Sequence, residues 1–305
     1  MAGMASHYRR GLALLALLAP LQAPAGLAQA QIASLTLATN SQEITGPRSR
    51  LAKDWQGLRP LPTTVEILVM PGHADSQGFG SGASGEAVAV YGARSMDPSM
   101  TDELYWNLLT VDAVVRLGQS RGLSIRSYDP LVRSIANAND PRTTWSRGKD
   151  HVLAGGYALE IHHDAHGSAG VGSGLIPPIS TSPSTIDESL AQEFGAFPRW
   201  FRDGLGAPKR GIAILEIGKL EGSFEARLRN PVTRQATIEA IAERVVLALE
   251  RGLGVSRDQA QPAVANQNGT QDGAQHGTEN GTLNSAQNAV FPPLSPPPAV
   301  VGSAP

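Results

Sequence analysis

The sequence predicts an α/β domain: a single domain with a mostly parallel twisted sheet, helices on both faces, and an active site at the carboxyl ends of the strands. Three observations lead to this prediction. Short apolar runs alternate with segments of helical periodicity. The stretch from 61 to 254, about 190 residues, is long enough to bury one core. Several histidines follow directly on the apolar runs.

Four apolar runs are expected to be buried strands, because they are short and rich in β-branched residues. They cover residues 65–69, 123–126, 156–161 and 211–217. Helices are expected over residues 102–119, 185–201 and 235–251. The last of these places one apolar face along the helix, made by Ile238, Ile241, Ala242, Val245 and Leu249. Alternating strands and helices indicate a parallel sheet, in which ligand sites form beyond the carboxyl ends of the strands.

The N-terminus has the layout of a secretory signal peptide over residues 1–30. Arg9 and Arg10 precede an apolar run over residues 11–18, and small residues end at Ala28-Gln29-Ala30. We therefore expect export to the periplasm, the cell wall or the extracellular space. The apolar run is shorter than the roughly 20 residues that cross a bilayer, so no integral membrane segment is expected after signal removal.

The two regions that flank the predicted domain are polar. Residues 31–60 are expected to be a linker or N-terminal extension, with a strand laid against the domain as the alternative. Residues 255–305 are rich in Asn, Gly and Pro and poor in apolar residues, which predicts a disordered tail.

Composition limits the kinds of site and partner. The chain has no cysteine, so a transition-metal site must be built from His, Asp and Glu. The formal net charge is −2, and loss of residues 1–30 with their two arginines makes it −4. A mildly acidic domain offers no electrostatic footprint for nucleic acid, so we expect no nucleic-acid partner. The sequence leaves the oligomeric state open.

Ionisable side chains gather at the ends of the predicted strands. His73 follows the first strand after Gly72, His162 and His163 end the third, and Glu216 lies near the end of the fourth. The carboxyl ends of parallel strands share one edge, so these side chains are expected near one another. His151 and His166 are expected at the surface.

Four motifs resemble those of the zinc-dependent N-acetylmuramoyl-L-alanine amidases, in the same order and with similar spacing over residues 61–254. Gly72-His73 after a strand is similar to the opening motif of that family. Glu103 with Asn107 is similar to its glutamate at the start of the next helix. Ile161-His162 is similar to its Ile-His strand end, and Leu215-Glu216 resembles the late strand with its catalytic glutamate.

The resemblance implies a zinc enzyme that cleaves the amide bond between N-acetylmuramic acid and L-alanine in peptidoglycan. It implies Zn²⁺ as cofactor, with His73, Glu103 and His162 as metal ligands and Glu216 as the catalytic general base. Two imidazoles, a carboxylate and an open position are typical of catalytic zinc. Without the resemblance, a strand-end salt bridge would be the simpler role for Glu216. Asp102, which adjoins Glu103, serves the helix dipole equally well.

Departures from the family pattern surround these residues. Where the family continues Gly-His with a glycine and a short acidic-glycine turn, this chain has Ala74-Asp75-Ser76-Gln77-Gly78, and a long glycine-rich insertion follows through Arg94. Glu160-Ile161-His162-His163-Asp164 replaces the usual Ser-Ile-His-Ala-Asn. Alternate strand residues share a face, so Glu160 or Asp164 is placed to orient the His162 ring. Pairing of Glu160 with Arg126 or Lys149 is an equal alternative.

Three functions remain open from the sequence. The first is a peptidoglycan amidase, the second is another zinc peptidase or metallohydrolase on the same scaffold, and the third is an inactive wall-binding protein of the same fold. The glycine-rich residues 167–174 follow a strand but run into Pro177-Pro178 and open no helix, so they are expected to form a loop on the substrate side.

Overall fold

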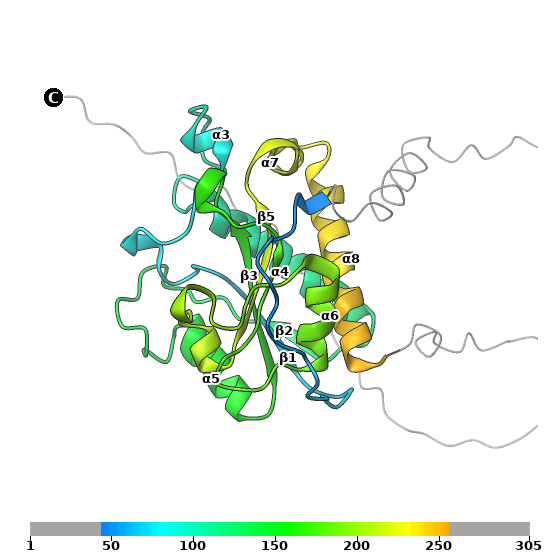
Figure 1. Ribbon diagram of the computed structural model, residues 1–305. Helices are drawn as coiled ribbons and strands as arrows, with labels where there is room; N and C mark the ends of the chain where they lie inside the picture. The colour runs from blue at the N-terminus through cyan, green and yellow to red at the C-terminus, as the bar shows by residue number, and fades with distance from the viewer. Residues whose placement is uncertain (1–43, 256–305) are drawn as a thin grey trace, which may run out of the picture. The chain divides into compact units, whose positions relative to one another are not determined.

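The structure is a computed structural model that describes residues 44–255. The expected signal peptide, residues 31–43 and the tail from residue 256 onward lie outside the described residues. Five strands form one sheet in the order β2-β1-β3-β5-β4 (Figure 1). β1, β2, β3 and β5 are parallel, and β4 runs antiparallel to β5. The expected mostly parallel sheet is confirmed.

The four parallel strands correspond to the four predicted runs, each displaced by a few residues at its ends. They are β1 (Ile67–Pro71), β2 (Ile125–Ser127), β3 (Tyr157–Asp164) and β5 (Ala213–Lys219). All five residues of β1 and all eight of β3 are buried. Continuous burial is typical of parallel strands covered on both faces, and it explains why these runs are apolar without alternation.

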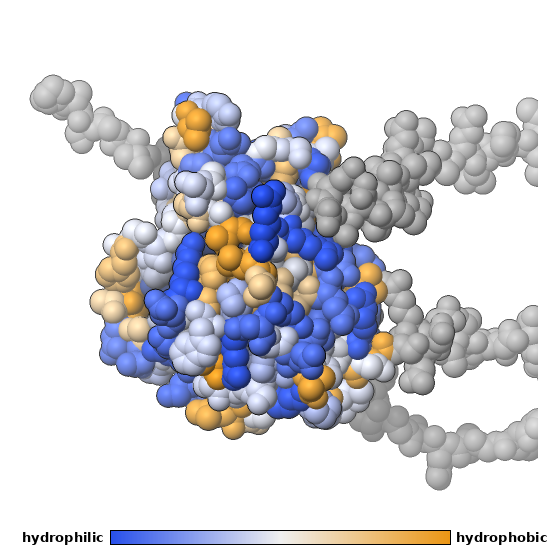
Figure 2. All heavy atoms as spheres, in the orientation of Figure 1, coloured by the Kyte–Doolittle hydropathy of each residue, from blue (hydrophilic) through white to orange (hydrophobic). Residues whose placement is uncertain are grey.

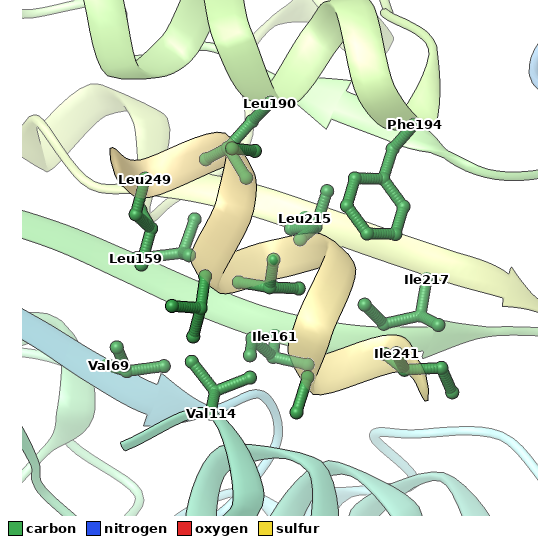
Figure 3. Packing of buried hydrophobic residues seen from close by; sticks show 14 of the residues in the cluster. Val69, Val114, Leu159, Ile161, Leu190, Phe194, Leu215, Ile217, Ile241 and Leu249 are labelled. Atoms are coloured by element: carbon green, nitrogen blue, oxygen red, sulfur yellow. The ribbon is translucent and has the colours of Figure 1, made fainter. Parts of the chain in front are cut away.

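One face of the sheet carries the larger hydrophobic core. Alternate side chains of the strands point to this face and pack under α4 (Asp102–Ser120), α6 (Thr185–Phe194) and α8 (Arg234–Leu253). Figure 3 shows this packing, in which the strands contribute Val69, Leu159, Ile161, Leu215 and Ile217 and the helices contribute Val114, Leu190, Phe194, Ile241 and Leu249. The expected apolar face of α8 is therefore the face that meets the sheet.

The opposite face of the sheet carries a smaller core. Leu68, Met70, Ala158 and Ile214 alternate with the residues of the first core and pack with Phe197. α5 (Thr144–Leu153) covers this side through Trp145 and Val152. Helices on both faces were expected, but α5 was not, because it is short and mainly polar and carries only a few apolar side chains.

The second predicted helix was too long at its C-terminal end. α6 begins with the expected acidic cap, where Ser184 and Asp187 form a capping box. It ends at Phe194, because Gly195 has a φ of 103°, which is not helical. Ala196 then forms a bridge with Leu175 of β4, and Pro198 follows. The short helices α3 (Glu86–Ala89) and α7 (Gly222–Arg229) were also missed from the sequence.

The glycine-rich segment after β3 is only partly a loop. Its end forms β4 (Gly174–Ile176), which pairs with β5 on the edge of the sheet. Two backbone N–H groups of the segment, those of Val171 and Gly172, donate to the Asp164 carboxylate. The prediction of a loop over residues 167–174 was therefore wrong at Gly174, and the strand that begins there was missed.

The described part of the N-terminal extension lies against the domain. Ile44 and Trp55 are buried in the larger core, and the indole N–H of Trp55 donates to the carbonyl of Phe197 at 2.8 Å. Arg48 and Arg59 form isolated parallel bridges with Ser173 and Ser184. Residues 44–60 thus lie against the domain through isolated bridges and form no continuous strand. No helix among residues 44–255 is long and apolar enough to cross a membrane.

The contact between α8 and α6 generates a test of this packing. A methyl group added at Gly252 would lie 2.5 Å from the Cα of Ile186, a backbone atom that cannot move alone. We predict that Gly252→Ala lowers the free energy of unfolding by about 1–3 kcal/mol, measured by urea denaturation.

Gly118→Ala on α4 is the matched control, because its nearest obstacle is a side-chain methyl of Ile125 at 2.9 Å. Its loss should be smaller, since side chains can shift and alanine favours helix. Unchanged stability of Gly252→Ala would contradict the close contact of the two helices.

Candidate metal centre

The parallel register of β1 and β3 brings two histidines to one edge of the sheet. Pro71 pairs with Ile161, and the backbone N–H of Gly72 donates to the carbonyl of Ile161 at 2.9 Å. His73 follows at once with a φ of 62°, an uncommon backbone conformation for a residue other than glycine. The His73 and His162 rings meet edge to face, with centroids 4.8 Å apart.

Glu103 reaches both histidines from the first turn of α4. Its Oε1 atom lies 3.2 Å from Nε2 of His73 and 3.1 Å from Nδ1 of His162. One potential ligand atom from each of the three residues lies within 4.8 Å of the other two. The sequence left Asp102 and Glu103 equivalent in their effect on the helix dipole. The structure separates them, because Asp102 pairs with Arg229 and accepts from the backbone of Met96.

Gly72 makes room for the His162 ring. A methyl group added at residue 72 would lie 2.2 Å from Cε1 and 2.3 Å from Nε2 of that ring. Asn107, one turn after Glu103 on α4, donates from its amide to the carbonyl of Gly72 at 3.1 Å. The Gly-His motif and the Glu-Asn pair of α4 are thus parts of one packed arrangement.

The glycine-rich insertion after His73 contributes partners that the sequence did not indicate. Ser81 Oγ lies 2.5 Å from Nδ1 of His73, on the side of the ring away from Glu103. The backbone N–H of Ala83 donates to Oε2 of Glu103 at 2.7 Å. The only available signal was the position of the insertion, which begins a few residues after His73.

Carboxylates outnumber cations around His162. Burial by itself raises the pKa of Glu103, but hydrogen bonds from His162 and His73 bring it down to about 2. Burial acts to lower the pKa of His162, yet Glu103, Glu160 and Glu216 together hold that pKa well above its usual value. The carboxylates on this side of the sheet thus create a negative electrostatic environment around His162, of the kind that favours a cation.

Glu216 lies beside His162 on the neighbouring strand. The two residues are register partners in β3 and β5, so their side chains share a face of the sheet. Glu216 is half-buried, and its Oε2 atom is buried without a hydrogen-bond partner among the described residues. Burial raises the pKa of Glu216 to about 8, with His162 opposing this rise and Asp164 and Glu103 adding to it. The structure shows no salt bridge to Glu216 within residues 44–255.

His163 points to the opposite face of β3 from His162. Its ring stacks on Phe224 with centroids 5.9 Å apart, and its Nδ1 lies 2.9 Å from Oδ1 of Asn107. That amide oxygen is an acceptor, so Nδ1 carries the proton. Burial lowers the pKa of His163 to about 3, which keeps the ring neutral. His163 thus lies under α4 and α7, away from the cluster.

The remaining described histidines lie apart from the cluster. His151 was expected at the surface, but it is buried, with Nε2 2.9 Å from the carbonyl of Glu66. That prediction was wrong because the helix that carries His151, α5, was not recognised. His166 is half-buried, and its Nδ1 lies 3.1 Å from the carbonyl of Ser84.

The three clustered residues fit a zinc ion. Tetrahedral zinc with bonds of 2.0–2.2 Å separates its ligand atoms by about 3.4 Å. The two distances from Glu103 to the imidazoles, 3.2 and 3.1 Å, are close to this separation. Two imidazole nitrogens and one carboxylate oxygen are also the donor types that catalytic zinc favours. Their role as ligands remains a prediction.

Paired histidine variants test which ring holds the metal. We predict that His162→Ala abolishes stoichiometric zinc binding, because it removes one of three donors. His163→Ala should retain zinc, although the cavity beside Phe224 should lower stability by roughly 1–3 kcal/mol. Metal analysis of the folded variants after dialysis measures both effects. Equal zinc loss in the two variants would contradict the assignment.

Comparison with known proteins gave matches only among solved structures. No family model matches the sequence, and no curated protein matches it. The chain is similar to the catalytic domain of CwlV, an N-acetylmuramoyl-L-alanine amidase from Bacillus (Paenibacillus) polymyxa var. colistinus. The two sequences are 16% identical, the match covers 63% of this chain and 99% of that chain, and the TM-score is 0.44. It is also similar to the putative N-acetylmuramoyl-L-alanine amidase from Neisseria meningitidis, with 14% identity, coverage of 63% and 97%, and a TM-score of 0.41.

Proposed function

We propose that the chain is an exported, zinc-dependent N-acetylmuramoyl-L-alanine amidase. It would hydrolyse the amide bond between N-acetylmuramic acid and L-alanine in peptidoglycan. The observation that carries this proposal is the cluster of His73, Glu103 and His162 with Glu216 alongside it. These residues are also those on which the sequence resembles the amidase family. A signal peptide at residues 1–30 would bring the enzyme to a cell-wall substrate.

In this proposal His73, Glu103 and His162 hold the metal. A bound zinc ion would supply a positive charge that activates water and polarises the carbonyl of the scissile amide. The partners around the cluster keep the donors in place: Ser81 contacts the second nitrogen of His73, and Ala83 donates to the second oxygen of Glu103. Fixed donors of this kind reduce the reorganisation that binding requires.

Glu216 would perform the proton transfers. Its carboxylate takes a proton from the attacking water as the new bond to the carbonyl carbon forms. The same proton then goes to the nitrogen of L-alanine as the amide bond breaks, so the carboxylate is regenerated. A carboxyl group with a pKa raised toward neutrality suits this exchange, because it can both accept and release a proton near pH 7.

Digestion of purified peptidoglycan tests the proposed bond specificity. The zinc-loaded protein should release intact stem peptides that begin with a free L-alanine amine, detected by mass spectrometry. A zinc peptidase would instead leave alanine on the sugar. Absence of any released peptide from a zinc-loaded, folded protein would support the inactive wall-binding alternative and contradict the proposal.

The Glu216→Gln variant separates catalysis from metal binding. Glutamine keeps the shape of the side chain but cannot accept the proton, so turnover should fall by roughly 10²–10⁴-fold. Zinc content and melting temperature should stay near those of the wild type.

Glu239→Gln is the matched control, because Glu239 is exposed on α8, where it accepts a hydrogen bond from Gln235. Its rate of stem-peptide release should equal that of the wild type. A normal rate in Glu216→Gln would remove Glu216 from the catalytic role.

A further inference from the structure

Glu160 is a buried carboxylate that the proposed reaction does not use. It lies on β3 two residues before His162 and is only 2% exposed. Its Oε1 atom has no hydrogen-bond partner within residues 44–255. An isolated ionised carboxylate is strongly disfavoured in such surroundings, so its charge requires a nearby compensating partner.

The compensating partner is the His162 ring. Oε2 of Glu160 lies 3.6 Å from Nε2 of His162, and this is the only ion pair of Glu160 in the described part of the chain. The alternative partner Arg126 pairs with Glu66 instead. Asp164, the other carboxylate that the strand pattern placed near His162, accepts from the backbone N–H groups of residues 165, 171 and 172.

The two nitrogens of His162 therefore face different carboxylates. Nδ1 faces Glu103 at 3.1 Å, within the three-residue cluster, and Nε2 faces Glu160, which is outside that cluster. His73 shows the same division with the nitrogens exchanged. Its Nε2 faces Glu103, and its Nδ1 faces Ser81. Each imidazole thus presents one nitrogen to the cluster and the other to a separate polar partner.

We propose that Glu160 is a positioning residue for His162, an inference that rests on the proposed metal site. The carboxylate accepts a hydrogen bond from Nε2–H of His162 and so leaves Nδ1 unprotonated and directed at the metal. The present separation of 3.6 Å closes to a hydrogen bond by a movement of about 0.5 Å. A carboxylate behind a metal-binding histidine fixes the tautomer and raises the basicity of the ligating nitrogen.

A purely structural role for Glu160 makes a different prediction. Filling space beside Met70 and Ala158 would affect folding, but it would leave the protonated nitrogen of His162 and the zinc affinity of the folded protein unchanged. The test must therefore measure zinc affinity and the protonated nitrogen of His162, and not stability alone.

Zinc affinity is measured on the purified protein by competition with a chelating indicator. Glu160→Ala should weaken zinc binding by roughly 10–100-fold. Glu160→Gln should recover part of this loss, because the amide oxygen can still accept from Nε2–H. Glu239→Gln is the control, since it removes an exposed carboxylate on α8 and should leave zinc affinity unchanged.

Long-range ¹H–¹⁵N NMR of the zinc-loaded wild type gives a second readout that needs no variant. The proposal requires that His162 binds through Nδ1 and carries its proton on Nε2. Coordination through Nε2 would overturn it, as would a folded Glu160→Ala variant with wild-type zinc affinity. If Glu160→Ala does not fold, Glu160→Gln and the NMR assignment decide the question. A wild type that binds no stoichiometric zinc would overturn the proposed metal site itself, and this inference with it.

Discussion

The parallel pairing of β1 with β3 and of β3 with β5 is the constraint on which the rest of the site depends. It brings the chain ends of three strands to one edge, where Gly72, His162 and Glu216 follow one another across the sheet. A shift of β3 by one residue would exchange the faces of His162 and His163. The ring of His163 would then meet the cluster, and that of His162 would lie under α4. Burial of Leu159 and Ile161 in the larger core opposes such a shift.

The electrostatics of this edge are unfavourable for stability. Glu103, Glu160 and Glu216 all raise the pKa of His162, while His162 and Arg202 lower that of Glu216. Polar atoms of Glu160, His162 and Glu216 are buried without hydrogen-bond partners among residues 44–255. In a protein core such groups are costly, and their concentration in one place is typical of functional sites.

The sequence predicted those elements whose apolar residues repeat at a regular spacing, and those site residues that lie at the ends of strands. The long helices α4 and α8 were predicted almost to the residue, because their apolar faces repeat over several turns. The convergence of His73 with His162 followed from the rule that parallel strands end at one edge. By contrast, α5 and β4 were missed. α5 is short and mainly polar, and β4 has three residues that begin with Gly174.

The partners of the site could not be predicted in the same way. Ser81 and Ala83 belong to an irregular insertion, and their positions depend on tertiary contacts that no local pattern encodes. The strand pattern also could not predict whether Glu160 or Asp164 contacts His162, since both residues share the face of β3 that carries His162. In the structure the backbone N–H groups of residues 171 and 172 donate to the Asp164 carboxylate, and Glu160 is the carboxylate that faces His162.

The insertion after His73 has a consequence for how the domain can be altered. Loops between strands and helices usually tolerate exchange and changes in length. The insertion after His73 contacts His73 and Glu103 through Ser81 and Ala83. Further along the insertion, the backbone N–H of Ala87 donates to Glu225 of α7. The insertion is therefore not a separable module. Transfer of His73, Glu103 and His162 to another scaffold, or replacement of the insertion by another loop, preserves their geometry only if the contacts of the insertion with His73, Glu103 and Glu225 are kept.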